Sequence, residues 1–357
     1  MRTYKGRVAA IALLLWTMLV PVAGASAQDE ADKAQSVVQH ATQKIEDRTA
    51  TNVDLPGKAA MMAWIDPSVT PWAAVLCIHG LGYHKESYSA LGRRLSRVGV
   101  AVYAIDVRGF GVYKETKRHA KVDFEQSFGD VKEAVTCMHA AYPKLPVYVL
   151  GESMGGAMAL QCATRYPELV NGVVSSVPSF NSLRNLPFGL KVALIGMTRG
   201  LHASVAISPA VVDKATDNPT LAKRVLNNPA TRHYLSVEDL IAYRRLMSGN
   251  GKASKQLTKT PILIVQGFKD KLIGPRSTTK LFNRIVVADK DLVLIGAAEH
   301  LVFEEGQFGD DTIDTVVSWL NKHNHEAEPY ALLPSQISKL RSPVKAIVGD
   351  GSVVIEK

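Results

Sequence analysis

The segment from Val147 to Leu160, which reads VYVLGESMGGAMAL, constrains the fold of this chain more than any other. An apolar run stops at Gly151, and Ser153 stands between Gly151 and Gly155 in the pattern G-x-S-x-G. Small residues then open a helix-compatible segment, Met154–Tyr166. A strand that turns this tightly into a helix strains the backbone at the serine, and the flanking glycines relieve the crowding. The pattern therefore predicts a strand, a sharp turn and a helix, with the serine hydroxyl held at the positive end of the helix.

Strand-like and helix-like segments alternate over much of the chain. The expected strands are short apolar runs: Met61–Ile65, Ala73–Ile78, Val100–Ile105, Val147–Leu150, Gly172–Val177, Ile262–Gln266 and Asp291–Ile295. The expected helices are Tyr88–Val98, Phe124–Ala141, Met154–Tyr166, Arg276–Val286 and Thr312–Lys322. Continuous apolar strands that alternate with helices predict an α/β fold with a mostly parallel sheet covered on both faces. Ligands bind such sheets at the carboxyl ends of the strands.

Candidate acid and base residues follow two of the later strands. A serine hydroxyl is a poor nucleophile without a neighbouring base, and the base needs a third group that holds its tautomer. Asp270 lies four residues past the strand Ile262–Gln266, and His300 lies in the loop after the strand Asp291–Ile295. Taken singly, Asp270 fits a turn carboxylate and His300 fits a surface-loop histidine. Their joint occurrence after Ser153, in this order, predicts a catalytic triad.

The same chemistry needs backbone N–H groups that stabilise a tetrahedral oxyanion. Met154, which follows the candidate nucleophile, and Leu81, in the glycine-rich loop HGLG, are the expected donors. His79 and His84 flank this loop and suggest metal ligands. Because no carboxylate or cysteine completes a ligand set with them, the sequence favours a role in bracing the loop. We expect no metal and no organic cofactor.

Five motifs give a specific resemblance. They are HGLG at 79–82, DVRGFG at 106–111, GESMGG at 151–156, QGFKD at 266–270 and EHLVFEE at 299–305. Together they resemble the monoacylglycerol lipase and lysophospholipase-like family of the α/β-hydrolases, over about Met61 to Asn321. The resemblance implies the α/β-hydrolase fold with an inserted helical cap. One departure is Glu152, a position where many relatives carry His and others carry Glu.

The resemblance also implies function. It assigns Ser153 as nucleophile, Asp270 as acid, His300 as base, and Leu81 and Met154 as oxyanion donors. We therefore expect a serine hydrolase that cleaves carboxylic esters through an acyl-enzyme. Two alternatives stay open, an aminopeptidase-like hydrolase on the same fold and a non-catalytic lipid-binding module. The family also contains esterases and some peptidases, so the resemblance does not fix the substrate.

The interval 178–260 breaks the alternation and is the expected cap. Its first part is very apolar, and we expect four side chains there to bind the substrate: Leu186, Phe188, Leu190 and Leu194. The alternative is that they form the cap's own core. The interval carries twelve Lys and Arg against four Asp and Glu. This excess favours contact with an anionic membrane or lipid surface, although a solvated basic face explains it equally well. No reading helix or interleaved aromatic residues accompany the basic residues, so nucleic acid is not an expected partner.

The two ends of the chain complete the organisation. A basic start, an apolar stretch and Ala25-Ser26-Ala27 form a signal-peptide pattern, which predicts a secreted or periplasmic protein; an uncleaved anchor is the alternative. The expected parts are a signal peptide 1–27, a leader 28–57, a hydrolase core in two pieces, 58–177 and 261–323, a cap 178–260, and a C-terminal tail 324–357. Within the tail, Val344–Ile355 either adds an edge strand or packs on the surface. Three cysteines, Cys77, Cys137 and Cys162, are expected to be buried, inert thiols rather than nucleophiles.

Overall fold

The structure is a computed structural model that describes residues 50–54, 59–115, 121–180, 186–324, 345–349 and 352–356. All of them lie in one compact unit, Thr49–Lys357. The expected signal peptide, 1–27, lies outside the described residues, as does most of the expected leader, 28–57. Within the described part of the chain, no helix is long and apolar enough to cross a membrane.

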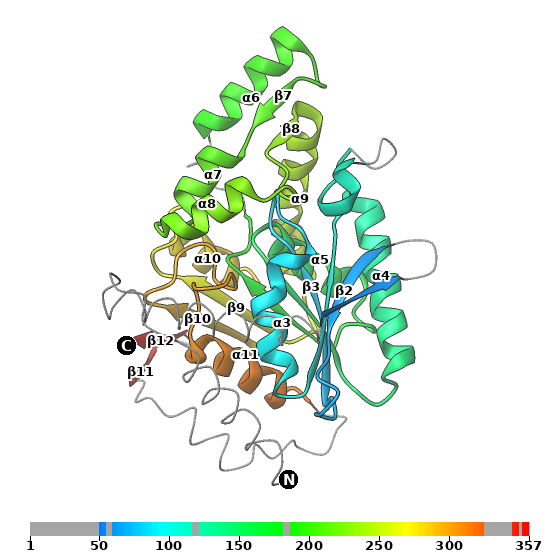
Figure 1. Cartoon of the computed structure of the whole chain (residues 1–357). Helices are drawn as coiled ribbons and strands as arrows, with labels where there is room; N and C mark the ends of the chain where they lie inside the picture. Colours follow the sequence, from blue (N-terminus) through cyan, green and yellow to red (C-terminus); the bar gives the residue numbers. More distant parts are fainter. Residues whose placement is uncertain are drawn as a thin grey trace, which may run out of the picture. The chain divides into compact units, whose positions relative to one another are not determined.

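A single large sheet organises the described residues, with ten strands in the order β1-β2-β4-β3-β5-β6-β9-β10-β12-β11 (Figure 1). The strands are β1 (Ala50–Asp54), β2 (Ala60–Trp64), β3 (Ala73–Ile78), β4 (Val100–Ile105), β5 (Val147–Glu152), β6 (Gly172–Ser176), β9 (Ile262–Gly267), β10 (Lys290–Ile295), β11 (Lys345–Gly349) and β12 (Ser352–Glu356). Every pair from β4 across to β12 is parallel, whereas β1–β2, β2–β4 and β11–β12 pair antiparallel. The expectation of a mostly parallel sheet is confirmed.

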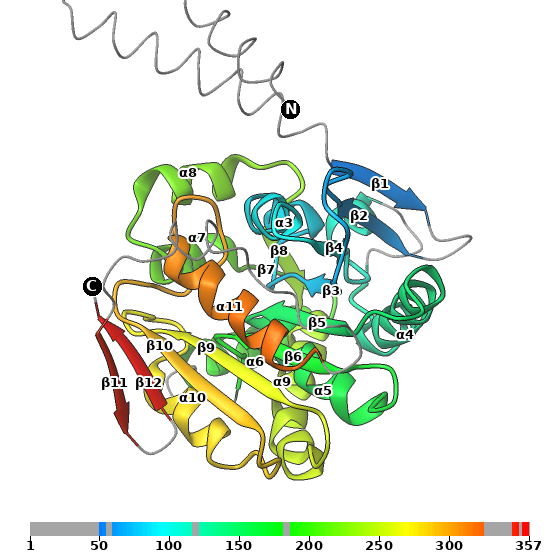
Figure 2. The same cartoon turned by 90° about the horizontal axis from the view of Figure 1, so that it is seen from below.

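Helices cover both faces of this sheet, as Figure 2 shows. The helices of the core are α3 (Ser89–Ser96), α4 (Phe124–Ala141), α5 (Met154–Arg165), α10 (Pro275–Phe282) and α11 (Asp310–Lys322), with short 3₁₀ turns η2 (Lys85–Tyr88) and η3 (Gly111–Glu115). On one face, α4, α5 and α10 share a hydrophobic cluster with Leu76 and Val149, while on the other α3 and α11 share a second cluster with Val75 and Leu150. Successive side chains of a strand thus point into the hydrophobic cores on opposite faces of the sheet. This explains why β3, β5 and β9 are buried along their whole length.

A helical insertion follows β6 and returns to the sheet at β9 (Figure 1). It contains α6 (Leu186–Arg199), β7 (Ser204–Ala206), α7 (Ser208–Ala215), α8 (Pro219–Asn227), β8 (Tyr234–Ser236) and α9 (Val237–Gln256). The long helix α9 begins at a capping box, in which Ser236 and Asp239 satisfy each other's backbone N–H groups. The Arg232 N–H donates to the carbonyl of Gly82, 2.7 Å away, so the insertion contacts the loop after β3.

The structure differs from the sequence interpretation at one edge of the sheet. Residues 50–54, assigned to the leader, form strand β1 beside β2. This strand is short and carries no continuous apolar run, so its sequence signal is weak. At the other edge, residues 345–349 and 352–356 form β11 and β12, in agreement with the alternative of an edge strand at Val344–Ile355. Among the cysteines, Cys77 and Cys162 are buried as expected, whereas Cys137 is exposed on α4; all three thiols are free.

Candidate active site

Ser153 occupies a strained turn between β5 and α5. Its φ is 57° and its ψ is −108°, a conformation that costs a non-glycine residue free energy and needs support from its surroundings. Gly155 provides part of that support. A Cβ at Gly155 would lie 1.7 Å from the carbonyl oxygen of Ile78, so only glycine lets α5 approach β3 this closely. The expected strand, turn and helix are present, and the Ser153 side chain is only 9% exposed.

Asp270 and His300 come together at the carboxyl ends of the adjacent strands β9 and β10. The Oδ2 atom of Asp270 lies 2.7 Å from Nδ1 of His300, and both side chains are buried. The other carboxylate oxygen, Oδ1, accepts hydrogen bonds from the N–H groups of Leu272 and Ile273, at 2.7 and 2.8 Å. The loop after β9 therefore fixes the Asp270 carboxylate, and the carboxylate fixes one ring nitrogen of His300.

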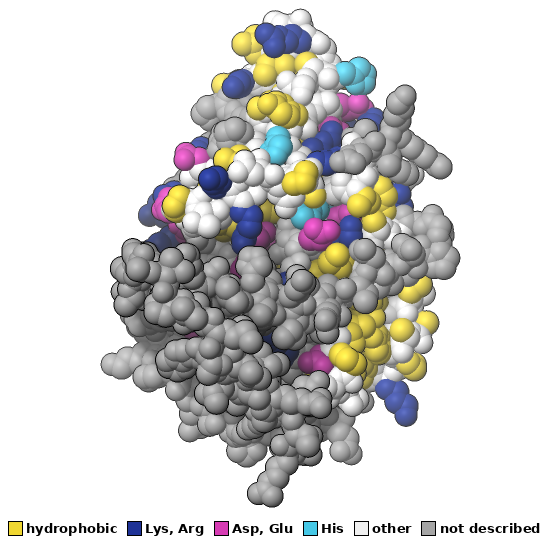
Figure 3. All heavy atoms as spheres, viewed as in Figure 1, with side chains coloured by type: hydrophobic (Ala, Val, Ile, Leu, Met, Phe, Trp, Pro, Cys, Tyr) yellow, Lys and Arg dark blue, Asp and Glu magenta, His cyan; other side chains and the backbone are white. Residues whose placement is uncertain are grey.

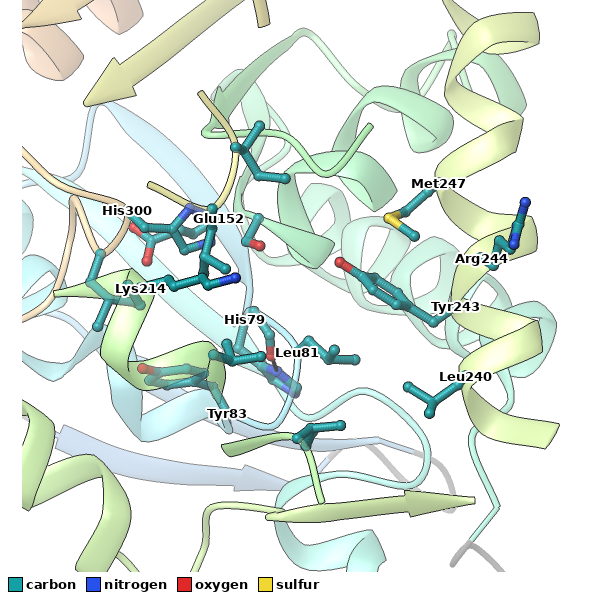
Figure 4. Close-up of a pocket in the computed structure, with 18 of the residues that line it drawn as sticks. His79, Leu81, Tyr83, Glu152, Lys214, Leu240, Tyr243, Arg244, Met247 and His300 are labelled. Atoms are coloured by element: carbon teal, nitrogen blue, oxygen red, sulfur yellow. Dashed lines mark hydrogen bonds between the residues drawn. The ribbon is translucent and has the colours of Figure 1, made fainter. Parts of the chain in front are cut away.

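A cavity of about 590 Å³ joins these elements (Figure 4). Ser153, His300 and Leu81 all line it. Met154 is the first residue of α5, so its N–H has no acceptor within the helix and stands at the positive end of the helix dipole. The loop after β3 runs beside the serine, because a Cβ placed on Gly80 would lie 3.7 Å from the Ser153 Cβ. The five residues predicted to carry the chemistry thus lie at one edge of the sheet.

His79 braces this loop. Its Nε2 accepts the Val107 N–H at 3.0 Å, so Nδ1 carries the proton and donates to the carbonyl of Gly80 at 2.8 Å. Burial lowers the pKa of His79 to about 4, which keeps the ring neutral in this arrangement. His84 contacts Asn228 instead. In the described residues, no group of three His, Cys, Asp or Glu side chains is placed to hold a metal ion.

Comparison with known proteins identifies the family. A family of hydrolases described as serine aminopeptidase, S33 (Hydrolase_4), matches residues 70–307, which is more than half of the chain. The chain belongs to this family. It is 27% identical to the monoacylglycerol lipase of Mycolicibacterium smegmatis over 260 residues, covering 72% of this chain and 91% of that one. It is 28% identical to human monoglyceride lipase over 254 residues, covering 71% and 83%.

Solved structures agree on the fold. A soluble variant of the monoglyceride lipase from Saccharomyces cerevisiae, in complex with a substrate analog, superposes with a TM-score of 0.65 at 20% identity, covering 76% of this chain and 94% of that one. A thermostable carboxyl esterase from Bacillus coagulans gives a TM-score of 0.64 at 17% identity, covering 77% and 99%. The expected α/β-hydrolase fold is confirmed, and the relatives support a carboxylic ester hydrolase.

Two largely buried carboxyl groups lie at the cavity beside the candidate triad. Glu152 and Glu304 both line the cavity, close to the hydroxyl of Tyr83. Burial, together with the charge of Glu304, raises the pKa of Glu152 well above its usual range. Burial likewise raises the pKa of Glu304 to about 7, against the opposing effect of Arg224. The Tyr83 hydroxyl is buried and has no hydrogen-bond partner among the described residues.

One expectation about the substrate pocket needs correction. The side chains of Leu190 and Leu194 point to solvent, with exposed fractions of 63% and 61%, and neither lines the cavity. Gly189, Val192 and Ala193 line it instead, because they lie on a different face of α6. The side chains of Leu186 and Phe188 lie outside the described residues. Helical spacing separates the two faces of α6 in the sequence, but it does not tell which face meets the core.

Several residues at this site were not anticipated. Tyr243, Leu240 and Met247 of α9 line the cavity (Figure 4), and Ser179, just after β6, touches the candidate nucleophile. The spacing of 240, 243 and 247 along a helix places the three on one side, which is the only sequence signal they carry. Nothing in the sequence marks Ser179.

Proposed function

We propose that this protein hydrolyses carboxylic esters of the monoacylglycerol, lysophospholipid or simple carboxylester type through the triad Ser153, His300 and Asp270. One observation carries the proposal: the Asp270–His300 hydrogen bond, 2.7 Å long, lies at the cavity that the strained Ser153 lines. Because Nδ1 of His300 is engaged by Asp270, Nε2 is the nitrogen left to accept the serine proton.

In this mechanism Ser153 Oγ attacks the ester carbonyl while His300 takes its proton. The N–H groups of Leu81 and Met154 stabilise the oxyanion of the tetrahedral intermediate. His300 then protonates the departing alcohol, which leaves an acyl-enzyme on Ser153. Water, deprotonated by the same histidine, releases the carboxylic acid and restores the serine. No metal or organic cofactor takes part.

The lining of the cavity supports a lipid ester as substrate. Val192, Leu240, Ile241 and Met247 give it an apolar side suited to an acyl chain. The Tyr83 hydroxyl and the buried carboxyl groups give it a polar side suited to the alcohol part. Buried hydroxyl and carboxyl groups without full partners favour a ligand that brings hydrogen-bonding groups of its own.

The family description also raises the aminopeptidase alternative. That activity needs an ionised carboxylate in the cavity that grips a free amine. The four acidic residues of the interval 178–260 do not line the cavity: Asp213, Asp217, Glu238 and Asp239. Of these, Asp217 pairs with Lys271, and Asp239 pairs with Arg232. Glu152 and Glu304 do line it, but their raised pKa values favour the neutral form of Glu152 and leave Glu304 only partly ionised near neutral pH. A neutral carboxyl binds an ammonium group poorly. These contacts favour the ester substrate.

The cap supports contact with a lipid surface. Leu190, Leu194 and Met197 are exposed side by side on α6, near the exposed Lys191 and Arg199. Figure 3 shows apolar and basic side chains together over this end of the molecule. An apolar helix face with basic neighbours suits the surface of an anionic membrane.

Export is also part of the proposal and rests on the sequence of residues 1–27 alone. Expression of the full chain in a bacterial host, followed by N-terminal sequencing of the periplasmic fraction, tests it. We expect a mature chain that starts at Gln28; a chain that stays in the cytosol with its first residues intact contradicts export.

Labelling with a fluorophosphonate probe tests the catalytic proposal. We expect the wild type to be labelled and Ser153→Ala to be inert, while Ser254→Ala, a buried serine of α9 outside the cavity, reacts normally. Hydrolysis of a monoacylglycerol and of nitrophenyl esters should greatly exceed hydrolysis of aminoacyl anilides. Undiminished labelling of Ser153→Ala would place the nucleophile elsewhere. Faster turnover of the anilides would favour the peptidase, and binding of lipid without turnover of any ester would favour the lipid-binding module.

A further inference from the structure

Three hydroxyl groups form a hydrogen-bonded chain that begins at the candidate nucleophile. The Oγ atoms of Ser153 and Ser179 lie 3.2 Å apart, and Ser179 Oγ lies 2.7 Å from the hydroxyl oxygen of Tyr243. Ser179 is fully buried just after β6, whereas Tyr243 projects from α9 into the cavity (Figure 4). These hydrogen bonds therefore connect the candidate nucleophile with α9, the helix that lines the cavity.

The number of protons fixes which hydroxyl donates in each of these two hydrogen bonds. Each hydroxyl has one proton, and the mechanism requires Ser153 to give its own to His300. The proton between Ser153 and Ser179 must then come from Ser179. By the same count, the proton between Ser179 and Tyr243 comes from Tyr243. Burial raises the pKa of Tyr243, so the phenol keeps the proton that it donates.

We propose that Ser179 is a further catalytic residue, which donates a hydrogen bond to Ser153 Oγ, and that Tyr243 is a positioning residue, which holds Ser179 in the donating orientation. The proposal rests on the ester-hydrolase function given above. Negative charge develops on Ser153 Oγ twice, when it attacks the ester and when it leaves the acyl-enzyme. A donor already aimed at this atom in a buried site stabilises both transition states without reorganisation.

The backbone around Ser179 is held as firmly as that of the nucleophile. The N–H of Ser179 donates to the carbonyl of Ser153 at 2.9 Å, and its own carbonyl accepts from the Asn250 side chain at 2.8 Å. Asn250, on α9, in turn accepts from Gln161 of α5 at 3.0 Å. Val177, two residues earlier, has a φ of 39°, which a β-branched residue adopts only under constraint. This network fixes Ser179 against both the elbow and the cap.

Two substitutions and their combination test the proposal. We expect Ser179→Ala to slow fluorophosphonate labelling and to lower kcat for a nitrophenyl ester by about tenfold, with KM changed less than about twofold. Tyr243→Phe removes a single oxygen atom, and we expect it to lower both rates about threefold. In the Ser179→Ala background the same Tyr243→Phe change should have no effect, because the group through which it acts is gone.

Tyr103→Phe is the matched control. It removes a tyrosine hydroxyl that pairs with Tyr142 at 3.0 Å, away from the cavity, and should leave both rates unchanged. Wild-type rates in Ser179→Ala or in Tyr243→Phe, or a full threefold effect of Tyr243→Phe in the double variant, would overturn the proposal. Tyr243→Phe alone keeps the test decisive if Ser179→Ala does not fold. Ser153→Ala separates the two claims, because its labelling and turnover report on the proposed function whatever the Ser179 variants do.

Discussion

The Glu152 carboxyl accepts a hydrogen bond from the N–H of Phe303 at 2.9 Å, which ties the residue before the candidate nucleophile to the loop after His300. The N–H of Val302 donates to the carbonyl of His300 at 3.2 Å and also interacts with the same carboxyl. Since β5 and this loop are far apart in sequence, Glu152 is a direct polar link between the segments that carry the proposed nucleophile and base. Burial raises the pKa of Glu152 well above its usual range, which favours the neutral carboxyl in this link.

Glu152→Gln and Glu152→Ala should therefore behave differently. Glutamine keeps the shape and the accepting oxygen of a neutral carboxyl, so we expect activity within about threefold of the wild type. Alanine leaves the N–H group of Phe303 buried without its acceptor, which should lower the free energy of unfolding by about 2 kcal/mol and reduce kcat. Urea denaturation and ester turnover measure the two effects. Equal stability of both variants would show that the link is dispensable.

Asp270→Asn tests the proposed orientation of His300. The N–H groups of Leu272 and Ile273 hold one oxygen of the side chain, so the amide of asparagine must turn its NH₂ group toward Nδ1 of His300. The ring then carries its proton on Nε2 and cannot accept the proton of Ser153. We expect kcat to fall by roughly 10³–10⁴-fold with little change in fold.

The chain offers a matched control for this substitution. Asp289 lies 3.2 Å from Nε2 of His323, a second Asp–His pair, and neither residue lines the cavity. We expect Asp289→Asn to leave kcat unchanged. A loss of activity in Asp289→Asn as large as that in Asp270→Asn would mean that kcat does not report on the proposed triad.

Glu304 should make the stability of the fold depend on pH. Burial raises the pKa of Glu304 to about 7, so the folded protein holds this proton over a range where the unfolded chain has lost it. A raised pKa in the folded state stabilises the fold fully below the ordinary glutamate pKa, and that stabilisation is lost as pH rises through 7. The shift corresponds to on the order of 3 kcal/mol.

Denaturation by urea between pH 4 and pH 8 measures this effect. We expect the wild type to lose stability over the range, and Glu304→Gln, which cannot ionise, to lose distinctly less. Glu305→Gln, a neighbouring and more exposed carboxyl, is the control and should follow the wild type. Identical pH profiles for Glu304→Gln and the wild type would contradict the assignment.

The sequence predicted those parts of the site that depend on one strand and the loop after it. Ser153 and Asp270 follow fully buried strands and His300 follows the partly buried β10, and parallel strands bring such loops to one edge. Ser179 and Tyr243 could not be predicted in this way, because their contact depends on how α9 packs across α5. Glu304 was equally hidden, since its raised pKa comes from burial that only the assembled fold creates.

Side-chain direction on helix α6 also could not be predicted from the sequence. Leu190 and Leu194 were candidates for the substrate pocket, yet they lie on the outer face of the helix together with Met197, which is 85% exposed. The residues recur at i, i+4 and i+7, so they form one stripe. An exposed apolar stripe on a cap rich in Lys and Arg is typical of a surface that meets another apolar phase.

Vesicle binding tests this interpretation of α6. We expect the wild type to bind anionic phospholipid vesicles, and to bind less as salt increases, because Lys191 and Arg199 contribute an electrostatic attraction that ions screen. Replacing Leu190, Leu194 and Met197 with serine should weaken binding at least tenfold while leaving hydrolysis of a short, soluble nitrophenyl ester unchanged, since none of the three lines the cavity. Val286→Ser removes an exposed apolar side chain outside the cap and should have no effect on binding. Binding that ignores lipid charge and salt would remove the electrostatic contribution, and undiminished binding of the triple variant would remove the role of α6 itself.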